Sequence, residues 1–242
     1  MGIFDNAETV IINNKEVQSI KIGTSILYEK PSGGQESNIL FEDACSSSSG
    51  LSNYRTAINI NQATNSSSPS LTYNSSNTCY TFTNGSSNDW MFYQIPELDG
   101  KGNFTLTAEV KIDTNTAPYV GIGTMPTESS LSNTYAEIMY SYYRNSSKIY
   151  TYGQRRRRGS STNITSGNVN QSPNSWFKLE MVFDNSNGVT MTWRKLDGTS
   201  LKTTTSTVTV TSPSNRYYGI VFRCNNPSYN AYIRNIKAEK NS

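Results

Sequence analysis

The chain has 242 residues, of which 34% are hydrophobic, 16% are charged and 11% are aromatic, and its formal net charge is +3. So many aromatic residues exclude a disordered chain, and so small a net charge gives no support to nucleic-acid binding. Because the sequence contains no histidine, it cannot form a Ser-His-Asp or Cys-His catalytic site by itself. The polar, uncharged and tyrosine-rich composition fits short β-strands joined by long polar loops.

The first thirty residues predict a small three-stranded β module. It contains three short apolar or alternating segments, at residues 9–12, 15–22 and 25–29. Asn13-Asn14 and Gly23-Thr24 lie between them and are typical of tight turns. Three such strands bury little apolar surface by themselves. We therefore expect the module to dock onto the rest of the chain, onto a copy of itself or onto another protein.

The sequence predicts three parts, namely the N-terminal module at residues 1–30, a linker at 31–37 and one larger domain at 38–242. The linker is rich in glycine, serine and proline, as flexible connections are. The first residues lack the basic and apolar regions of a signal peptide. No apolar run approaches the ~18 residues of a membrane helix, so we expect no membrane insertion.

Segments with a period of two predict the strands of a β-sandwich in the larger domain. Phe104–Ile112 and Phe177–Phe183 place an apolar residue at every second position, which puts one face of each strand in a core and the other in water. Asp197-Gly198 indicates a hairpin turn. The alternation slips between Ile233 and Ile236, which indicates a β-bulge. No segment has a 3.6-residue period over about ten residues, so we expect almost no helix.

Most of residues 38–240 resembles the laminin-G-like or concanavalin-A-like jelly-roll family. The resemblance implies an all-β fold class, with a jelly-roll β-sandwich behind the small three-stranded module. The segments that carry it are Asn103–Ile112, Ser175–Met181, Gly188–Arg194, Leu196–Gly198, Tyr218–Phe222 and Ala231–Lys237.

The N-terminal stretch is similar to short β modules that begin tail and fibre proteins of phages and of viruses of methanogenic archaea. Asn13–Gly23 and Ile26–Lys30 carry this resemblance. It implies a virion protein, exposed on the particle surface, that attaches to other virion proteins through residues 1–30. It also implies a homo-oligomer, with a trimer favoured.

A tyrosine-rich hairpin is the strongest candidate for a ligand surface. The more apolar face of its first strand carries Ala136, Ile138, Tyr140 and Tyr142, and we expect this face to point inward. The other face then meets the ligand, because a sugar offers C–H groups to aromatic rings and hydroxyl groups to polar side chains. We predict that a host surface glycan is bound by Tyr135, Glu137, Tyr143, Arg144, Tyr150 and Tyr152. The alternative is that these tyrosines are ordinary half-buried strand residues.

An arginine run follows the hairpin at residues 155–158. In a strand, Arg155 and Arg157 share a face, and guanidinium groups match phosphate and carboxylate groups bidentately. We therefore add both residues to the predicted ligand-binding set, with an anionic polymer as the matching chemistry. A solvated loop, or a rim paired with acidic groups of a neighbouring subunit, is an alternative that stays open. Nucleic acid is not an expected partner.

The acidic residues do not form a recognisable hydrolytic site. Glycoside hydrolysis requires two carboxyl groups that flank the scissile bond, and on a strand such a pair occupies alternate positions. Glu97 and Asp99 have this spacing, but Pro96 and Gly100 indicate a loop there. We therefore predict no catalytic residues and no enzymatic activity.

No cofactor or disulfide is required by the sequence. A turn at Asp184, Asn185 and Asn187 has the side chains for a calcium ion, although plain hairpin chemistry explains the same residues. The cysteines form either one disulfide plus a thiol or three buried thiols, and they are Cys45, Cys79 and Cys224. The predicted function is a glycan-binding protein on a virion appendage. The alternative is a structural baseplate or tail-decoration protein.

Overall fold

The structure of the protein is a computed structural model. The structure describes residues 10–12, 15–17, 19–22, 25–29, 38–55, 58–60, 64–65, 70–83, 90–113, 118–126, 136–143, 148–157, 160–184, 188–206, 216–224 and 231–241. The chain divides into two units, Met1–Asn38 and Ile39–Ser242. The attachment role of residues 1–30 stays a prediction.

The described residues of the N-terminal unit form four short strands in two antiparallel pairs, in place of the expected three-stranded meander. β1 (Val10–Ile12) pairs with β2 (Lys15–Val17), and β3 (Ser19–Ile22) pairs with β4 (Ser25–Glu29). The expected middle strand, residues 15–22, is thus two strands. Its first half pairs with the strand before it and its second half with the strand after it, so each of the four strands described in this unit is paired along one edge.

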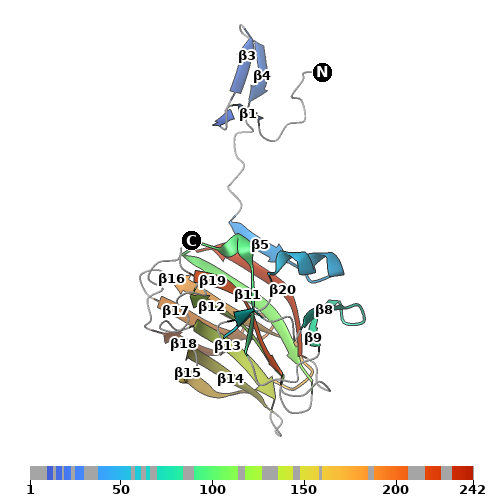
Figure 1. Cartoon of the computed structure of the whole chain (residues 1–242), viewed down its shortest axis with the longest axis vertical. Helices are drawn as coiled ribbons and strands as arrows, with labels where there is room; N and C mark the ends of the chain where they lie inside the picture. Colours follow the sequence, from blue (N-terminus) through green and yellow to red (C-terminus); the bar gives the residue numbers. More distant parts are fainter. Residues whose placement is uncertain are drawn as a thin grey trace. The chain divides into compact units, whose positions relative to one another are not determined.

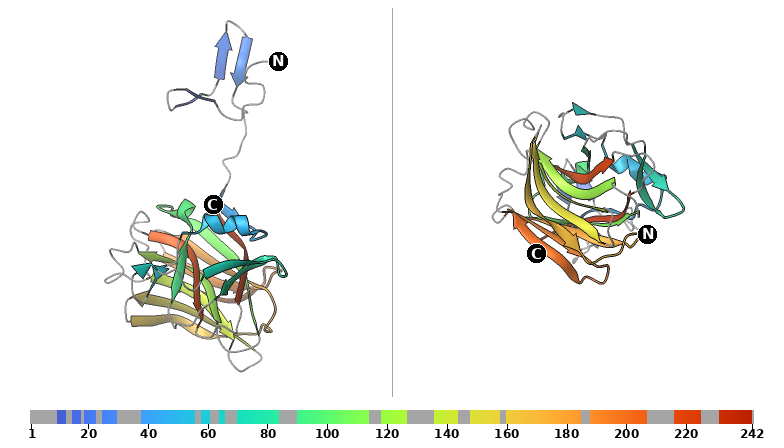
Figure 2. Two further views of the ribbon diagram at one scale, coloured as in Figure 1. Left: turned by 45° about the vertical axis from the view of Figure 1, so that its right-hand side comes forward. Right: turned by 90° about the horizontal axis from the view of Figure 1, so that it is seen from below.

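The larger unit is an antiparallel β-sandwich, in which two sheets pack against each other (Figures 1 and 2). The residues that the structure describes contribute eight strands to each sheet. One sheet, called here the β13 sheet, consists of β6 (Ile58–Asn59), β7 (Thr64–Asn65), β10 (Met91–Gln94), β12 (Pro118–Pro126), β13 (Ala136–Tyr143), β14 (Ile149–Arg157), β15 (Ser160–Val169) and β19 (Arg216–Cys224). The other, called the β11 sheet, consists of β5 (Ile39–Asp43), β8 (Ser70–Asn74), β9 (Cys79–Thr83), β11 (Phe104–Ile112), β16 (Phe177–Asp184), β17 (Gly188–Arg194), β18 (Ser200–Ser206) and β20 (Ala231–Lys240).

The strands connect in jelly-roll fashion, so neighbours in a sheet are often distant in sequence. In the β13 sheet the order is β15-β14-β13-β12-β19-β10-β6-β7, and in the β11 sheet it is β18-β17-β16-β11-β20-β9-β8, with β5 also on β20. Besides the strands, the described residues contain two short 3₁₀ helices, η1 (Ser48–Asn53) and η2 (Pro96–Leu98). The all-β jelly-roll prediction is confirmed.

The main core lies between the two sheets. β11 buries every second side chain from Phe104 to Ile112, and β16 does the same from Phe177 onward. The indole N–H of Trp193, on β17, donates a hydrogen bond to the hydroxyl of Ser141 on β13 at 3.0 Å. This buried bond ties the two sheets together, and it fixes which face of β13 points into the sandwich.

Two local predictions are also confirmed. The chain turns between β17 and β18 at Asp197-Gly198, where Gly198 has a φ of 87° and the Asp197 carboxylate accepts a 2.8 Å bond from the Thr199 amide. Asn235 has a φ of 48°, at the point where the register between β20 and β11 shifts. The left-handed residue accommodates the extra residue of a bulge, as the slipped apolar spacing indicates.

Two of the three cysteines, Cys45 and Cys79, are buried free thiols, and the side chain of Cys224 lies outside the described residues. Burial raises the pKa of the Cys79 thiol to about 11. Within the described ranges, no helix has the length and apolar character needed to cross a membrane.

Candidate functional site

The outer face of the β13 sheet, which points away from the β11 sheet, carries a continuous group of aromatic rings. The inner face of the same strands supplies alternate residues, such as Met139 and Ile220, to the main core. The rings come from the residue before β10 and from β12, β13 and β14. We call them the aromatic face, and they are Trp90, Tyr119, Tyr140, Tyr142, Tyr150 and Tyr152.

Strand register places the tyrosines of β13 directly beside those of β14. Tyr140 lies opposite Tyr152 and Tyr142 opposite Tyr150. The ring centroids of each pair are 5.4 Å apart, with interplanar angles of 4° and 26°. Both pairs are therefore stacked, and cross-strand aromatic pairs of this kind stabilise the sheet that presents them. Tyr119 of β12 extends the group, at 4.6 Å from Tyr142.

Trp90 joins the tyrosines from the start of β10. Its ring centroid lies 4.5 Å from that of Tyr140 and 5.5 Å from that of Tyr119. The indole is 1% exposed, and its N–H has no hydrogen-bond partner among the residues that the structure describes. A buried donor without an acceptor is costly.

Exposure divides the aromatic face into a buried part and an accessible part. Trp90, Tyr140 and Tyr142 are buried, whereas Tyr119, Tyr150 and Tyr152 are partly exposed. The accessible rings rest on the buried ones, which restrict their rotation. A ligand that stacks on them therefore loses little entropy in ordering the protein.

Two arginines border Trp90. The Arg156 guanidinium carbon lies 4.7 Å from the ring centroid and that of Arg223 lies 5.6 Å from it. Arg223 also lies 5.0 Å from the Tyr119 ring. Burial lowers the pKa of Arg156 to about 10, and the Arg223 charge lowers it as well, while Tyr140 acts in the opposite direction. A guanidinium group carries a positive charge, so these two side chains make this end of the aromatic face basic.

The assignment of the two faces of β13 from sequence is wrong. Ile138, Tyr140 and Tyr142 belong to the outer cluster, whereas Met139 belongs to the main core and Ser141 bonds to the opposite sheet. The outer face is the more apolar one, because it carries an aromatic cluster of its own. The rule that the more apolar face of a strand points into the main core therefore gives the wrong face for β13.

Glu137, expected on the ligand surface, is buried on the inner side of the β13 sheet. Its side chain is 0% exposed, and its oxygens lie 3.7 Å from Arg155 Nε and 3.8 Å from Arg216 Nη1. Burial raises the pKa of the Glu137 carboxyl to about 7, although both arginines lower it. Arg155, another predicted ligand residue, is thus the partner of an internal carboxylate.

The structure brings two residues of the predicted set, Tyr150 and Tyr152, into the aromatic face. Tyr135 and Arg144 lie outside the described residues, as do the side chains of Tyr143 and Arg157. Ligand binding by all of these residues stays a prediction. Sequence reasoning missed several members of the site, namely Trp90, Tyr119, Tyr140, Tyr142, Arg156 and Arg223. The four consecutive large side chains at Trp90–Tyr93 were a signal that β10 has two covered faces.

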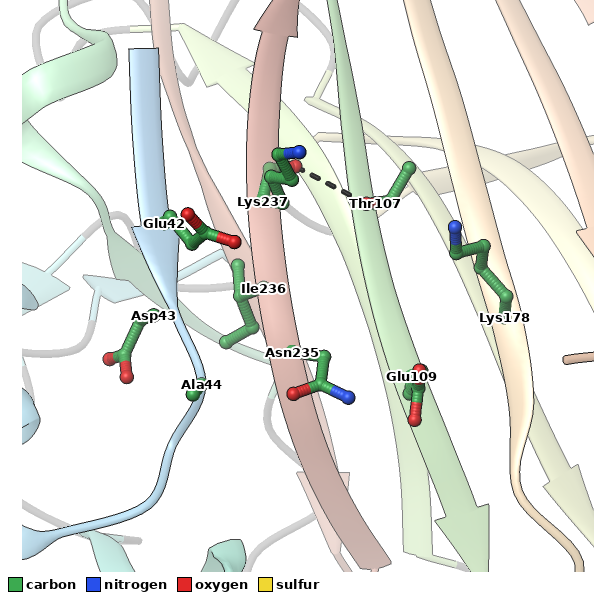
Figure 3. A pocket seen from close by; sticks show the side chains of 9 residues that line it. All are labelled: Glu42, Asp43, Ala44, Thr107, Glu109, Lys178, Asn235, Ile236 and Lys237. Carbon is green, nitrogen blue, oxygen red and sulfur yellow. Dashed lines mark hydrogen bonds between the residues drawn. The ribbon is translucent and has the colours of Figure 1, made fainter. Parts of the chain in front are cut away.

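A small pocket lies on the outer face of the β11 sheet, where β5 ends beside the bulge of β20. Figure 3 shows Glu42 and Glu109 on opposite sides of β20 and Lys178 on the next strand. Its volume is about 160 Å³, which is below the usual size of a small-molecule site. Glu109 is paired with Arg234 at 2.9 Å. The lining residues are Glu42, Asp43, Ala44, Thr107, Glu109, Lys178, Asn235, Ile236 and Lys237.

The two carboxylates considered for catalysis, Glu97 and Asp99, lie in η2 and directly after it. Glu97 is exposed on η2, and Asp99 accepts two bonds from Gln94 Nε2 at 2.7 and 2.6 Å. The described part of the chain contains no group of three or more metal-ligating side chains. The turn considered for calcium, residues 185–187, lies outside the described residues.

Solved structures of the same fold come from several classes of protein. The potassium-bound carbohydrate recognition domain of Emp46p has a TM-score of 0.57 and 10% identity, over 85% of this chain and 97% of that one. The CBM2 module of the evolved Dit of Lactobacillus casei BL23 phage J-1 has a TM-score of 0.56 and 9% identity, over 83% and 94%. A xylan β-1,4-xylosidase from Bacillus halodurans C-125 has a TM-score of 0.52 and 5% identity, over 73% of this chain and 35% of the enzyme.

The sequence itself matches no protein-family model and no curated protein. At identities of 10% or less, the structural similarities show the fold and leave the ligand open. One of these three similar structures is named a carbohydrate recognition domain, and another is named a CBM2 module of a phage protein.

Proposed function

We propose that this chain is a non-enzymatic, virion-associated tail or fibre protein that binds a host cell-surface glycan through the aromatic face. The observation that carries the proposal is the stacking of Tyr140 on Tyr152 and of Tyr142 on Tyr150, which holds two partly exposed rings in place. The C–H groups of a sugar ring pack against such rings, and polar groups beside them take its hydroxyls.

The virion part of the proposal rests on two supports. The phage J-1 module has the same fold, and the N-terminal stretch is similar to modules that begin tail and fibre proteins. In this assignment residues 1–30 attach to other virion proteins, the chain forms a homo-oligomer, with a trimer favoured, and the sandwich faces the host on the particle surface. No cofactor is part of the proposal.

A structural baseplate or tail-decoration protein is the second candidate. One observation favours it, because Trp90 and Tyr140 are only 1% and 3% exposed. Rings this buried also suit a second hydrophobic core, with the rest of the face covered by another subunit. Under this alternative the aromatic face is an assembly interface and binds no sugar.

Binding of the full chain to a panel of bacterial and archaeal cell-wall glycans separates the two candidates. The informative variants are Tyr150→Ala and Tyr152→Ala. Tyr73→Ala is the matched control, because Tyr73 is a partly buried strand tyrosine of the β11 sheet. We expect each of the first two to weaken binding about tenfold, with the control unchanged. A folded, oligomeric chain that binds no glycan on the panel would refute glycan binding.

A further inference from the structure

Two positive charges converge on one aromatic ring at the edge of the aromatic face. Arg156 comes from β14 and Arg223 from β19, and β13 and β12 separate these strands in the sheet. Both guanidinium groups nevertheless lie within 5.6 Å of the Trp90 ring centroid, so side chains from two separated strands meet at one indole.

The ring attracts both cations, but the cations repel each other. Each guanidinium interacts favourably with the electron-rich face of the indole. Their mutual repulsion is one cause of the lowered pKa of Arg156, after burial. An anion placed beside both groups interacts favourably with each of them, more strongly where water is partly excluded. Guanidinium groups also match carboxylate, sulfate and phosphate oxygens bidentately.

The charged end and the stacking end of the aromatic face are joined by direct ring contacts. Arg156 lies over Trp90, Trp90 lies 4.5 Å from Tyr140, and Tyr140 lies 5.4 Å from Tyr152. A sugar ring stacked on the exposed tyrosines is therefore close to the arginines through its substituents or through the next sugar of the chain.

We propose that the glycan bound at the aromatic face is acidic, and that its carboxylate, sulfate or phosphate group is held by Arg156 and Arg223. This inference rests on the proposed glycan binding, and it adds the chemical class of the ligand. It differs from the arginine pair expected from sequence, because Arg155 is the partner of buried Glu137.

The test compares acidic glycans with neutral counterparts on the full chain. The probes are polygalacturonate against its methyl ester for carboxylate, dextran sulfate against dextran for sulfate, and ribitol-phosphate teichoic acid for phosphate. Binding is measured at about 150 mM salt, where weak surface attraction is screened. We expect wild type to bind at least one acidic probe about tenfold more tightly than the neutral probes.

Substitutions test whether Arg156 and Arg223 hold the anionic group of the glycan. Arg156→Gln and Arg223→Gln should each weaken binding of the acidic probe about tenfold more than they weaken binding of the neutral probes. Arg223→Lys keeps the charge and should retain part of the affinity for the acidic probe. Arg234→Gln is the matched control, because Arg234 also lies over an indole, 4.1 Å from the Trp176 centroid, but on the β11 sheet. Thermal unfolding checks that each variant is folded.

The possible outcomes distinguish the inference of an acidic ligand from the proposed glycan binding on which it rests. Equal binding of acidic and neutral probes, lost in Tyr152→Ala, would overturn the acidic ligand and keep the glycan site. An acid preference that Arg234→Gln reduces as much as Arg223→Gln would also overturn it. No binding of any probe would refute both. The wild-type comparison decides the case even if a glutamine variant fails to fold.

Discussion

Replacing Glu137 by glutamine should remove a pH dependence of stability that burial creates in the wild-type chain. The Glu137 carboxylate is fully buried, and its distances of 3.7 and 3.8 Å to Arg155 and Arg216 are too long for hydrogen bonds. Desolvation therefore outweighs the two positive charges, and the pKa rises to about 7 in the folded chain from about 4.5.

The direction of this pH dependence is set by whether the folded or the unfolded chain binds the Glu137 proton more tightly. Because the folded chain has the higher pKa, protonated Glu137 contributes stability in full below about pH 4.5, and this contribution is lost as pH rises through about 7. The difference between these two pKa values corresponds to about 3 kcal/mol. Glutamine does not titrate, so the variant should gain about this much relative to wild type between pH 4 and pH 8.

Urea unfolding of the full chain at the two pH values, followed by tryptophan fluorescence, measures this difference. All three tryptophans lie in the unit Ile39–Ser242, so the signal reports on the sandwich. Glu180→Gln is the control, because this carboxylate is partly exposed and pairs with Arg194 at 2.6 Å. A Glu137→Gln chain whose stability relative to wild type is the same at both pH values would refute the reasoning.

Two further predictions concern the β13 sheet. A Cβ on Gly121 would overlap the carbonyl oxygen of Met139, which is backbone and cannot move aside. Gly121→Ala should therefore lower the free energy of unfolding by about 1–3 kcal/mol. An unchanged midpoint of thermal unfolding would contradict this prediction. Trp193→Phe removes the bond to Ser141 Oγ. A double-mutant cycle with Ser141→Ala should give a coupling of about 1 kcal/mol, and zero coupling would show that the bond does not stabilise the pairing of the sheets.

The sandwich could be predicted from sequence wherever a strand has one buried and one wet face. β11 and β16 alternate strictly because each packs on the other sheet on one side and meets solvent on the other. The hairpin at Asp197-Gly198 and the bulge near Asn235 were also predictable, since both depend on local backbone geometry.

The candidate site could be predicted only in part, for a physical reason. Period two shows that Glu137 and Ile138 lie on opposite faces of β13, but it does not show which face points inward. That choice depends on Trp193, a residue of the other sheet. Trp90 and Arg223 join Tyr140 through strand neighbours that are distant in sequence, so local pattern carries no information on their proximity.

The two covered faces of the β13 sheet have a consequence for how the chain tolerates mutation. On β11, polar substitutions are acceptable at alternate positions, because every second side chain reaches solvent. On β13, the side chains from Ala136 to Tyr142 are all buried, so no position is free in this way. Sequence drift in this protein should therefore be slowest along β13, where a change on either side disturbs either the junction of the sheets or the aromatic face.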